Sequence, residues 1–103
     1  TGAAAALQAA AQPGNKIGAV VSRGGRPDMA SALTLSQAAC PTLLIVGGLD
    51  DVVIELNKDA YQNMHCTKHL TIIPGATHLF EEPGTLEKVA SLACEWFTQY
   101  LIA

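Results

Sequence analysis

Two side chains suited to acid–base chemistry lie in glycine-containing segments, each of which follows an apolar run. Asp50 comes after the apolar residues 42–46, and His78 comes after the apolar residues 70–73. If both runs are strands of one parallel sheet, the loops at their carboxyl ends meet at the same edge. A carboxylate that holds an imidazole prepares the ring to act as a general base. The spacing therefore predicts a catalytic pair, with Asp50 as the orienting acid and His78 as the base.

A second interpretation of the same residues needs no chemistry. Asp50 and Asp51 precede a segment with helical periodicity, and aspartate is a common residue at the start of a helix. His78 would then be an ordinary loop residue. The two interpretations differ in one quantity, the distance between the Asp50 carboxylate and the His78 ring.

Metal binding is a further possibility, because imidazole and thiolate groups coordinate zinc. The candidates are His65, Cys66, His69 and His78. A four-ligand zinc site usually contains two close pairs of Cys or His, and here no second close pair follows the first. We expect His65 and His69 near a helix end and Cys66 as a small buried residue, with no metal and no other cofactor.

The elements that must position the acid and the base are predicted to alternate along the chain. Three runs of apolar, largely β-branched residues indicate strands at residues 17–21, 42–46 and 70–73. Because these runs are continuous and not alternating, all three are expected to be buried on both faces of a parallel sheet. Helices are expected at about residues 2–11, 27–37, 53–64 and from 85 onward. This order predicts a three-stranded α/β unit with right-handed crossovers.

Composition limits the partners and the compartment. The net charge is −3 and the six Lys and Arg residues are scattered, so no basic stripe for nucleic acid is present. The apolar runs are much shorter than the roughly 20 residues of a membrane span. Three cysteines at wide spacing do not suggest a disulfide framework. We expect a cytoplasmic protein that binds neither nucleic acid nor membranes.

Three segments together resemble one known family. Residues 47–53 (GGLDDVV) and 74–80 (PGATHLF) resemble the acid and histidine loops of dienelactone-hydrolase-like α/β-hydrolases. Residues 20–28 (VVSRGGRPD) are similar to a subgroup in which some members are joined to a phosphoribosyltransferase domain. The resemblance covers nearly the whole chain. It implies an α/β fold, the C-terminal half of an α/β-hydrolase with parallel strands flanked by helices.

The resemblance also implies where the nucleophile belongs. In this fold the serine stands in G-x-S-x-G, ahead of the acid and the histidine along the chain. Thr1-Gly2 matches the last two positions of that motif, so the serine is expected immediately before Thr1. Residues 1–103 are then a partial hydrolase domain without the N-terminal strands and the nucleophile turn.

Two residues of the chain are potential substitutes for that serine. Ser22, Asp50 and His78 keep the expected order, but Val20 occupies a position where the nucleophile turn needs glycine. Ser22 is more simply a residue of a turn that leaves a strand. Thr1 could act through its own amine, although no other residue supports this.

Two functions from different classes follow from these observations. In the first, the parent protein is a serine-type hydrolase of a small ester, lactone or related acyl substrate. Arg23, Arg26 and Phe80 are then the candidates to reach that substrate. In the second, the chain is a non-catalytic fragment or interaction module. Both predict that the exposed edge of the strand at residues 17–21 pairs with the missing N-terminal segment or with a second copy.

Overall fold

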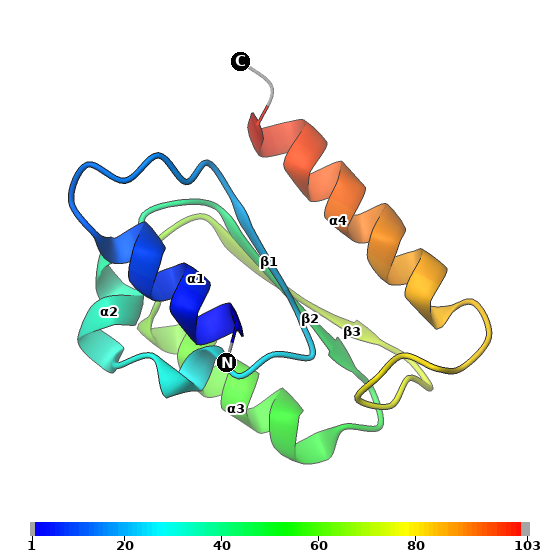
Figure 1. The fold of residues 1–103 in the computed structure, drawn as a ribbon. Helices are drawn as coiled ribbons and strands as arrows, with labels where there is room; N and C mark the ends of the chain where they lie inside the picture. Colours follow the sequence, from blue (N-terminus) through cyan, green and yellow to red (C-terminus); the bar gives the residue numbers. More distant parts are fainter. Residues whose placement is uncertain (1, 102–103) are drawn as a thin grey trace.

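A three-stranded parallel sheet lies between two layers of helices in the computed structural model, which describes residues 2–101 (Figure 1). The strands are β1 (Val20–Arg23), β2 (Thr42–Gly47) and β3 (Lys68–Ile73), in the order β1-β2-β3. The helices are α1 (Gly2–Ala11), α2 (Ala32–Gln37), α3 (Asp51–Asn63) and α4 (Thr85–Leu101), with a 3₁₀ turn at Pro27–Met29. This arrangement confirms the predicted α/β unit.

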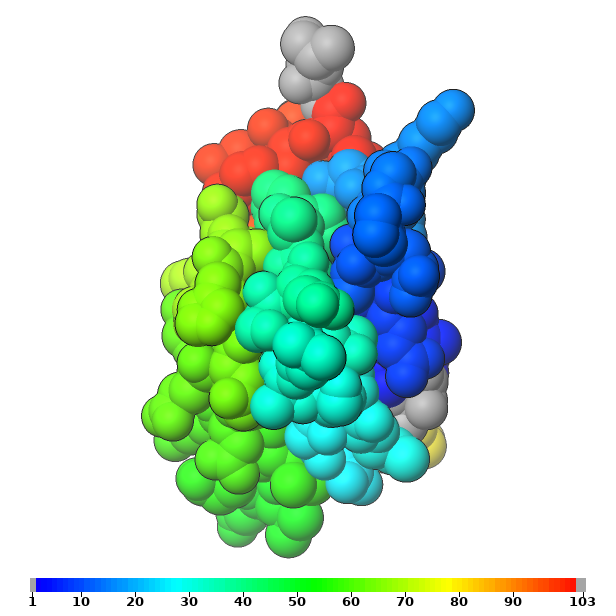
Figure 2. Space-filling view, turned by 90° about the vertical axis from the view of Figure 1, so that its left-hand side faces the viewer, coloured from blue at the N-terminus to red at the C-terminus, as the bar shows by residue number. Residues whose placement is uncertain are grey.

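The helices are divided between the two faces of the sheet. α1, α2 and α3 pack side by side on one face, where Figure 2 shows them as a continuous surface. α4 lies on the other face, against β1 and β2 (Figure 1). Among the described helices, none is both long enough and apolar enough to cross a membrane.

The burial of the central strand, β2, explains why the sequence of this strand is apolar without interruption. All six residues of β2 are buried. Leu44 belongs to the core under α1, α2 and α3, whereas its neighbours Leu43 and Ile45 belong to the core under α4. Because successive side chains of a strand point to opposite faces, a strand covered on both faces needs apolar residues at every position.

The first strand lies later in the sequence than predicted. β1 starts at Val20 and not at residue 17, and it extends to Arg23. The register pairs Val20 with Thr42, and the Val20 N–H donates to the Pro41 carbonyl at 2.9 Å. Residues before Val20 would lie opposite Pro41, which has no N–H to give to a ladder. The strand prediction at residues 17–21 was therefore wrong at both ends.

Two further predictions need correction. The helix expected over residues 27–37 is interrupted, because Ser31 is extended (φ −65°, ψ 157°) and its hydroxyl accepts the Thr34 N–H as the cap of α2. β3, expected to be fully buried, consists mostly of partly buried and exposed residues: Ile73 is buried, whereas Ile72 is 40% exposed. β3 lies at the edge of the described sheet, where no neighbouring strand covers it.

β1 forms the opposite edge of the described sheet and pairs only with β2 there. The N–H groups of Val20 and Gly24 donate toward β2, so the alternating N–H groups of Val21 and Arg23 point to the open edge. An unpaired edge with apolar side chains is a template for association. We expect the purified chain of 103 residues to dimerise or aggregate.

Analytical ultracentrifugation measures this association directly. Val21→Pro removes an edge N–H without removing a bond to β2, and should shift the chain toward monomer while circular dichroism stays unchanged. A stable monomer of the unsubstituted chain at high concentration would show that the β1 edge does not drive association.

Candidate active site

The loops that follow β2 and β3 are held together by their main chains. The Gly48 N–H donates to the Ile73 carbonyl at 2.8 Å, and the Leu49 N–H donates to the Ala76 carbonyl at 3.0 Å. Gly47 allows this approach, because a Cβ at that position would lie 2.7 Å from the Thr77 carbonyl oxygen. The two loops therefore form one rigid edge at the carboxyl ends of the strands.

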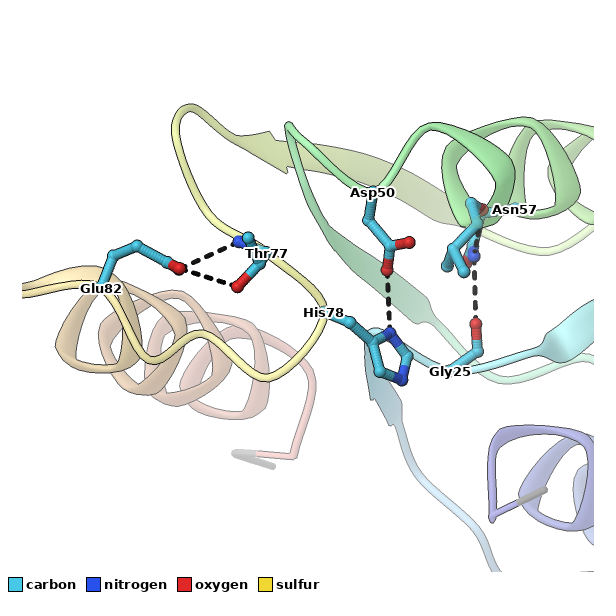
Figure 3. A network of polar contacts seen from close by, with 7 residues as sticks. Gly25, Asp50, Asn57, Thr77, His78 and Glu82 are labelled. Atoms are coloured by element: carbon cyan, nitrogen blue, oxygen red, sulfur yellow. Dashed lines mark hydrogen bonds and ion pairs between the residues drawn. The ribbon is translucent and has the colours of Figure 1, made fainter.

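This edge brings Asp50 and His78 into contact. The Oδ2 atom of Asp50 lies 2.8 Å from the Nδ1 atom of His78 (Figure 3). Asp50 occupies the position before α3, yet its carboxylate makes no capping hydrogen bond. The helix-cap interpretation is therefore wrong for the Asp50 side chain, and the predicted contact with His78 is present.

The two members of the pair differ in exposure. The Asp50 side chain is 18% exposed, whereas the His78 side chain is 55% exposed. When Nδ1 of a neutral ring donates its hydrogen to the carboxylate, Nε2 carries a free lone pair. No described residue forms a hydrogen bond with Nε2 of His78. The ring can therefore accept a proton at Nε2 from a group that approaches its exposed side.

The segment that leaves β1 lies beside the pair. Gly24 has a φ of +58°, and a Cβ there would lie 3.0 Å from the His78 carbonyl oxygen and 3.5 Å from His78 Nδ1. Asn57, from α3, donates from Nδ2 to the Gly25 carbonyl at 3.1 Å and so ties this segment down (Figure 3). Glycine at position 24 permits both the left-handed conformation and the close approach.

A second contact fixes the histidine loop from the other side. The Glu82 carboxylate accepts the Thr77 hydroxyl at 2.7 Å and the Thr77 N–H at 2.9 Å (Figure 3). The Thr77 hydroxyl and then its N–H hold the pKa of Glu82 below its ordinary value. The carboxylate therefore stays ionised over the neutral range and holds the residue immediately before His78.

Ser22 does not occupy the turn that the sequence indicates for it. It lies within β1 and it is 4% exposed. Its hydroxyl has no hydrogen-bond partner among the described residues, so it is not joined to His78. Thr1, the other potential substitute for the nucleophile, lies outside the described residues.

The three residues expected to reach a substrate have different environments. The Arg26 guanidinium makes two bonds of 2.9 Å to the Asp28 carboxylate, which hold the pKa of Asp28 below its ordinary value. Phe80 is 2% exposed and packs in the core under α4, so its assignment to a substrate surface was wrong. Arg23 is exposed at the end of β1.

The histidines and cysteines that could ligate a metal do not converge. Within residues 2–101 no group of three or more His, Cys, Asp or Glu side chains is arranged to hold a metal ion. His69 lies near the start of β3, whereas His78 follows the end of that strand. The Cys66 thiol lies 3.9 Å from the Thr42 hydroxyl and is partly buried.

Sequence reasoning placed Gly24 at the exit of the first strand but did not identify its approach to His78, nor Asn57 or the Thr77–Glu82 contact as parts of this edge. Asn57 is buried in α3, and its position on the apolar face of the predicted helix is the signal that the sequence carries. No pattern marks the Thr77–Glu82 contact, because both residues stand in an irregular loop.

The fold and the position of the pair define an α/β-hydrolase architecture. A dienelactone hydrolase of Anabaena variabilis, known from a crystal structure, superimposes with a TM-score of 0.92 at 56% sequence identity. The match covers 97% of this chain and 46% of the hydrolase, so the chain corresponds to about half of that fold.

Curated relatives carry a different description. A "Putative phosphoribosyl transferase" of Mycobacterium tuberculosis, found in strains CDC 1551 and H37Rv, is 60% identical over 101 residues. These residues are 98% of this chain but 23% of the relative. The chain therefore spans about a quarter of the length of the curated relatives it matches. No family model matches the chain.

Proposed function

We propose that the chain is the C-terminal part of a dienelactone-hydrolase-like serine hydrolase that acts on a small ester, lactone or related acyl substrate. The observation that carries the proposal is the 2.8 Å contact between Asp50 and His78. The pair stands at the carboxyl edge of a parallel sheet, where ligands bind in open α/β folds. The likeness to a dienelactone hydrolase at 56% identity supports the acyl chemistry.

In this proposal the two residues have separate roles. His78 accepts the proton of a serine hydroxyl through Nε2 while the serine oxygen attacks the acyl carbon, and it later returns the proton to the leaving group. Asp50 holds the ring through Nδ1 and stabilises the imidazolium that forms. The exposed face of His78 is consistent with a partner that approaches from outside the described residues.

The nucleophile is proposed to come from the polypeptide that leads into α1. The order of the fold is nucleophile, acid and histidine, and Asp50 and His78 follow α1 in that order. The complete domain then includes further N-terminal strands, one of which pairs with the open edge of β1. The transferase description of the curated relatives is compatible with this, because the match covers only 23% of their length. A phosphoribosyltransferase domain joined to the hydrolase would account for it.

Hydrolysis of a p-nitrophenyl ester tests the proposal. We expect the full-length protein to release p-nitrophenol with saturation kinetics and to be labelled by a fluorophosphonate. Residues 1–103 alone should show neither, because they would supply the acid and the base without the nucleophile. Activity of residues 1–103 alone would locate the nucleophile within them, and inactivity of a folded full-length protein toward acyl substrates would refute the proposal.

The alternative, a non-catalytic interaction module, is favoured by one observation, the open edge of β1. It predicts that residues 1–103 bind a partner strand whether or not Asp50 and His78 are intact. The ester assay on the full-length protein separates the two functions.

A further inference from the structure

A pocket lies between α1 and the open edge of β1. Its volume is about 230 Å³, and its wall combines the first turns of α1 with the end of β1. The residues that line it are Gly2, Ala3, Ala6, Val21, Ser22, Arg23 and Gly25. Apart from Arg23 the lining is uncharged.

One polar atom of this pocket lacks a partner. Ser22 is 4% exposed, and its Oγ atom is buried without a hydrogen bond to any described residue. A buried hydroxyl that is left unpaired destabilises a protein, so such groups nearly always have a partner. The nearby Gly25 carbonyl accepts the Asn57 amide at 3.1 Å and forms no hydrogen bond with the Ser22 hydroxyl. The partner of Ser22 is therefore expected outside residues 2–101.

The position of α1 indicates which segment supplies that partner. Gly2, the first residue of α1, lines the same pocket, and consecutive Cα atoms are only about 3.8 Å apart. In the proposed full-length protein, the polypeptide that leads into α1 therefore meets the helix beside this pocket. The chain also covers only 46% of the dienelactone hydrolase that it resembles, so the larger fold has further polypeptide to set against this open edge.

We propose that Ser22 is a positioning residue whose hydroxyl bonds to the main chain of the turn that enters α1. This inference rests on the proposed function, in which that turn carries the nucleophile. Ser22 then holds the turn at a fixed distance from His78, and it does not attack the substrate. Gly25 permits this close packing, because a Cβ at that position would lie 2.5 Å from Ser22 Oγ and 2.8 Å from the Ala3 Cβ.

The test uses the full-length protein with Ser22→Ala, Ser22→Thr and a control, Ser91→Ala, which removes an exposed hydroxyl of α4. A fluorophosphonate forms a bond from the nucleophile oxygen to phosphorus, expels fluoride and gives the serine proton to His78. We expect Ser22→Ala to lower kcat and the labelling rate about tenfold, because a small displacement of a reacting group is costly. KM should change little, and the variant should remain folded at the assay temperature. Ser22→Thr should restore the rate, and Ser91→Ala should match the unsubstituted protein.

Amide hydrogen exchange supplies a readout that needs no activity. The peptide that covers the turn into α1 should exchange faster in Ser22→Ala than in the unsubstituted protein, and at the original rate in Ser22→Thr. Unchanged exchange would overturn the inference even if the protein hydrolyses no ester. If His78→Ala abolishes labelling but Ser22→Ala labels at the normal rate, the positioning role fails while the proposed function stands. Loss of labelling by about 10⁴-fold in a folded Ser22→Ala protein would instead make Ser22 the nucleophile.

Discussion

Replacing His78 with alanine in the full-length protein is expected to lower kcat/KM for an acyl substrate by about 10⁴-fold or more. His78 is the one histidine in contact with a carboxylate in the described structure. Its Nε2 atom forms no hydrogen bond with any described residue. In the proposed mechanism, losing the ring removes the group that accepts the serine proton and returns it to the leaving group. Initial rates with a p-nitrophenyl ester measure the loss.

His69→Ala is the matched control for this substitution. His69 is an exposed histidine in β3, and removing it takes away the same side chain from the opposite end of the strand. It should change kcat/KM by less than about twofold, as an exposed substitution away from the site does. If His69→Ala and His78→Ala had equal effects, the loss would reflect stability and not catalysis.

Asp50→Asn tests whether Asp50 orients the His78 ring for catalysis or only contacts it. The asparagine keeps the size of the side chain but removes the charge that holds Nδ1–H, so the ring can turn or adopt the wrong tautomer. Its expected effect is a fall in kcat of up to about 10⁴-fold, with KM nearly unchanged. A normal kcat for Asp50→Asn would show that the 2.8 Å contact with His78 is structural.

The parts of the fold that the sequence predicts well are those whose signal is local. β2 is apolar at consecutive positions because it is buried on both faces, and the prediction differs from the observed strand only at Gly47. α1 is composed largely of alanine and its bounds are as predicted. The contact between Asp50 and His78 follows from one topological rule, since both residues leave the same edge of a parallel sheet.

The parts that the sequence predicts poorly depend on partners far away in the chain. β1 starts later in the chain than predicted because its register places the residue before Val20 opposite Pro41. Residues 17–21 carry no signal of this pairing. The exposure of β3 follows from its position at the sheet edge and not from its composition. The unpaired hydroxyl of Ser22 is visible only when burial and hydrogen bonds are both known.

Gly47→Ala is expected to lower the free energy of unfolding by about 3 kcal/mol, the upper part of the usual range for overpacking a buried site. A Cβ at Gly47 would overlap the Ala76 carbonyl and lie 2.7 Å from the Thr77 carbonyl oxygen. These atoms belong to the main chain, so no side chain can rotate away to relieve the contact. The loop after β3 must shift as a unit, and His78 must shift with it.

Urea denaturation followed by circular dichroism measures the change, with Ser91→Ala as the control. Ser91 is exposed in α4, and alanine is the stronger helix former, so that substitution should leave stability equal or slightly higher. The His78 ring resonances report the second consequence, because a displaced loop loses the contact between Nδ1 and the Asp50 carboxylate. Equal midpoints for the two variants would mean that the loops after β2 and β3 are not packed as closely as the structure has them, and the geometry that supports a catalytic role for Asp50 and His78 would lose its basis.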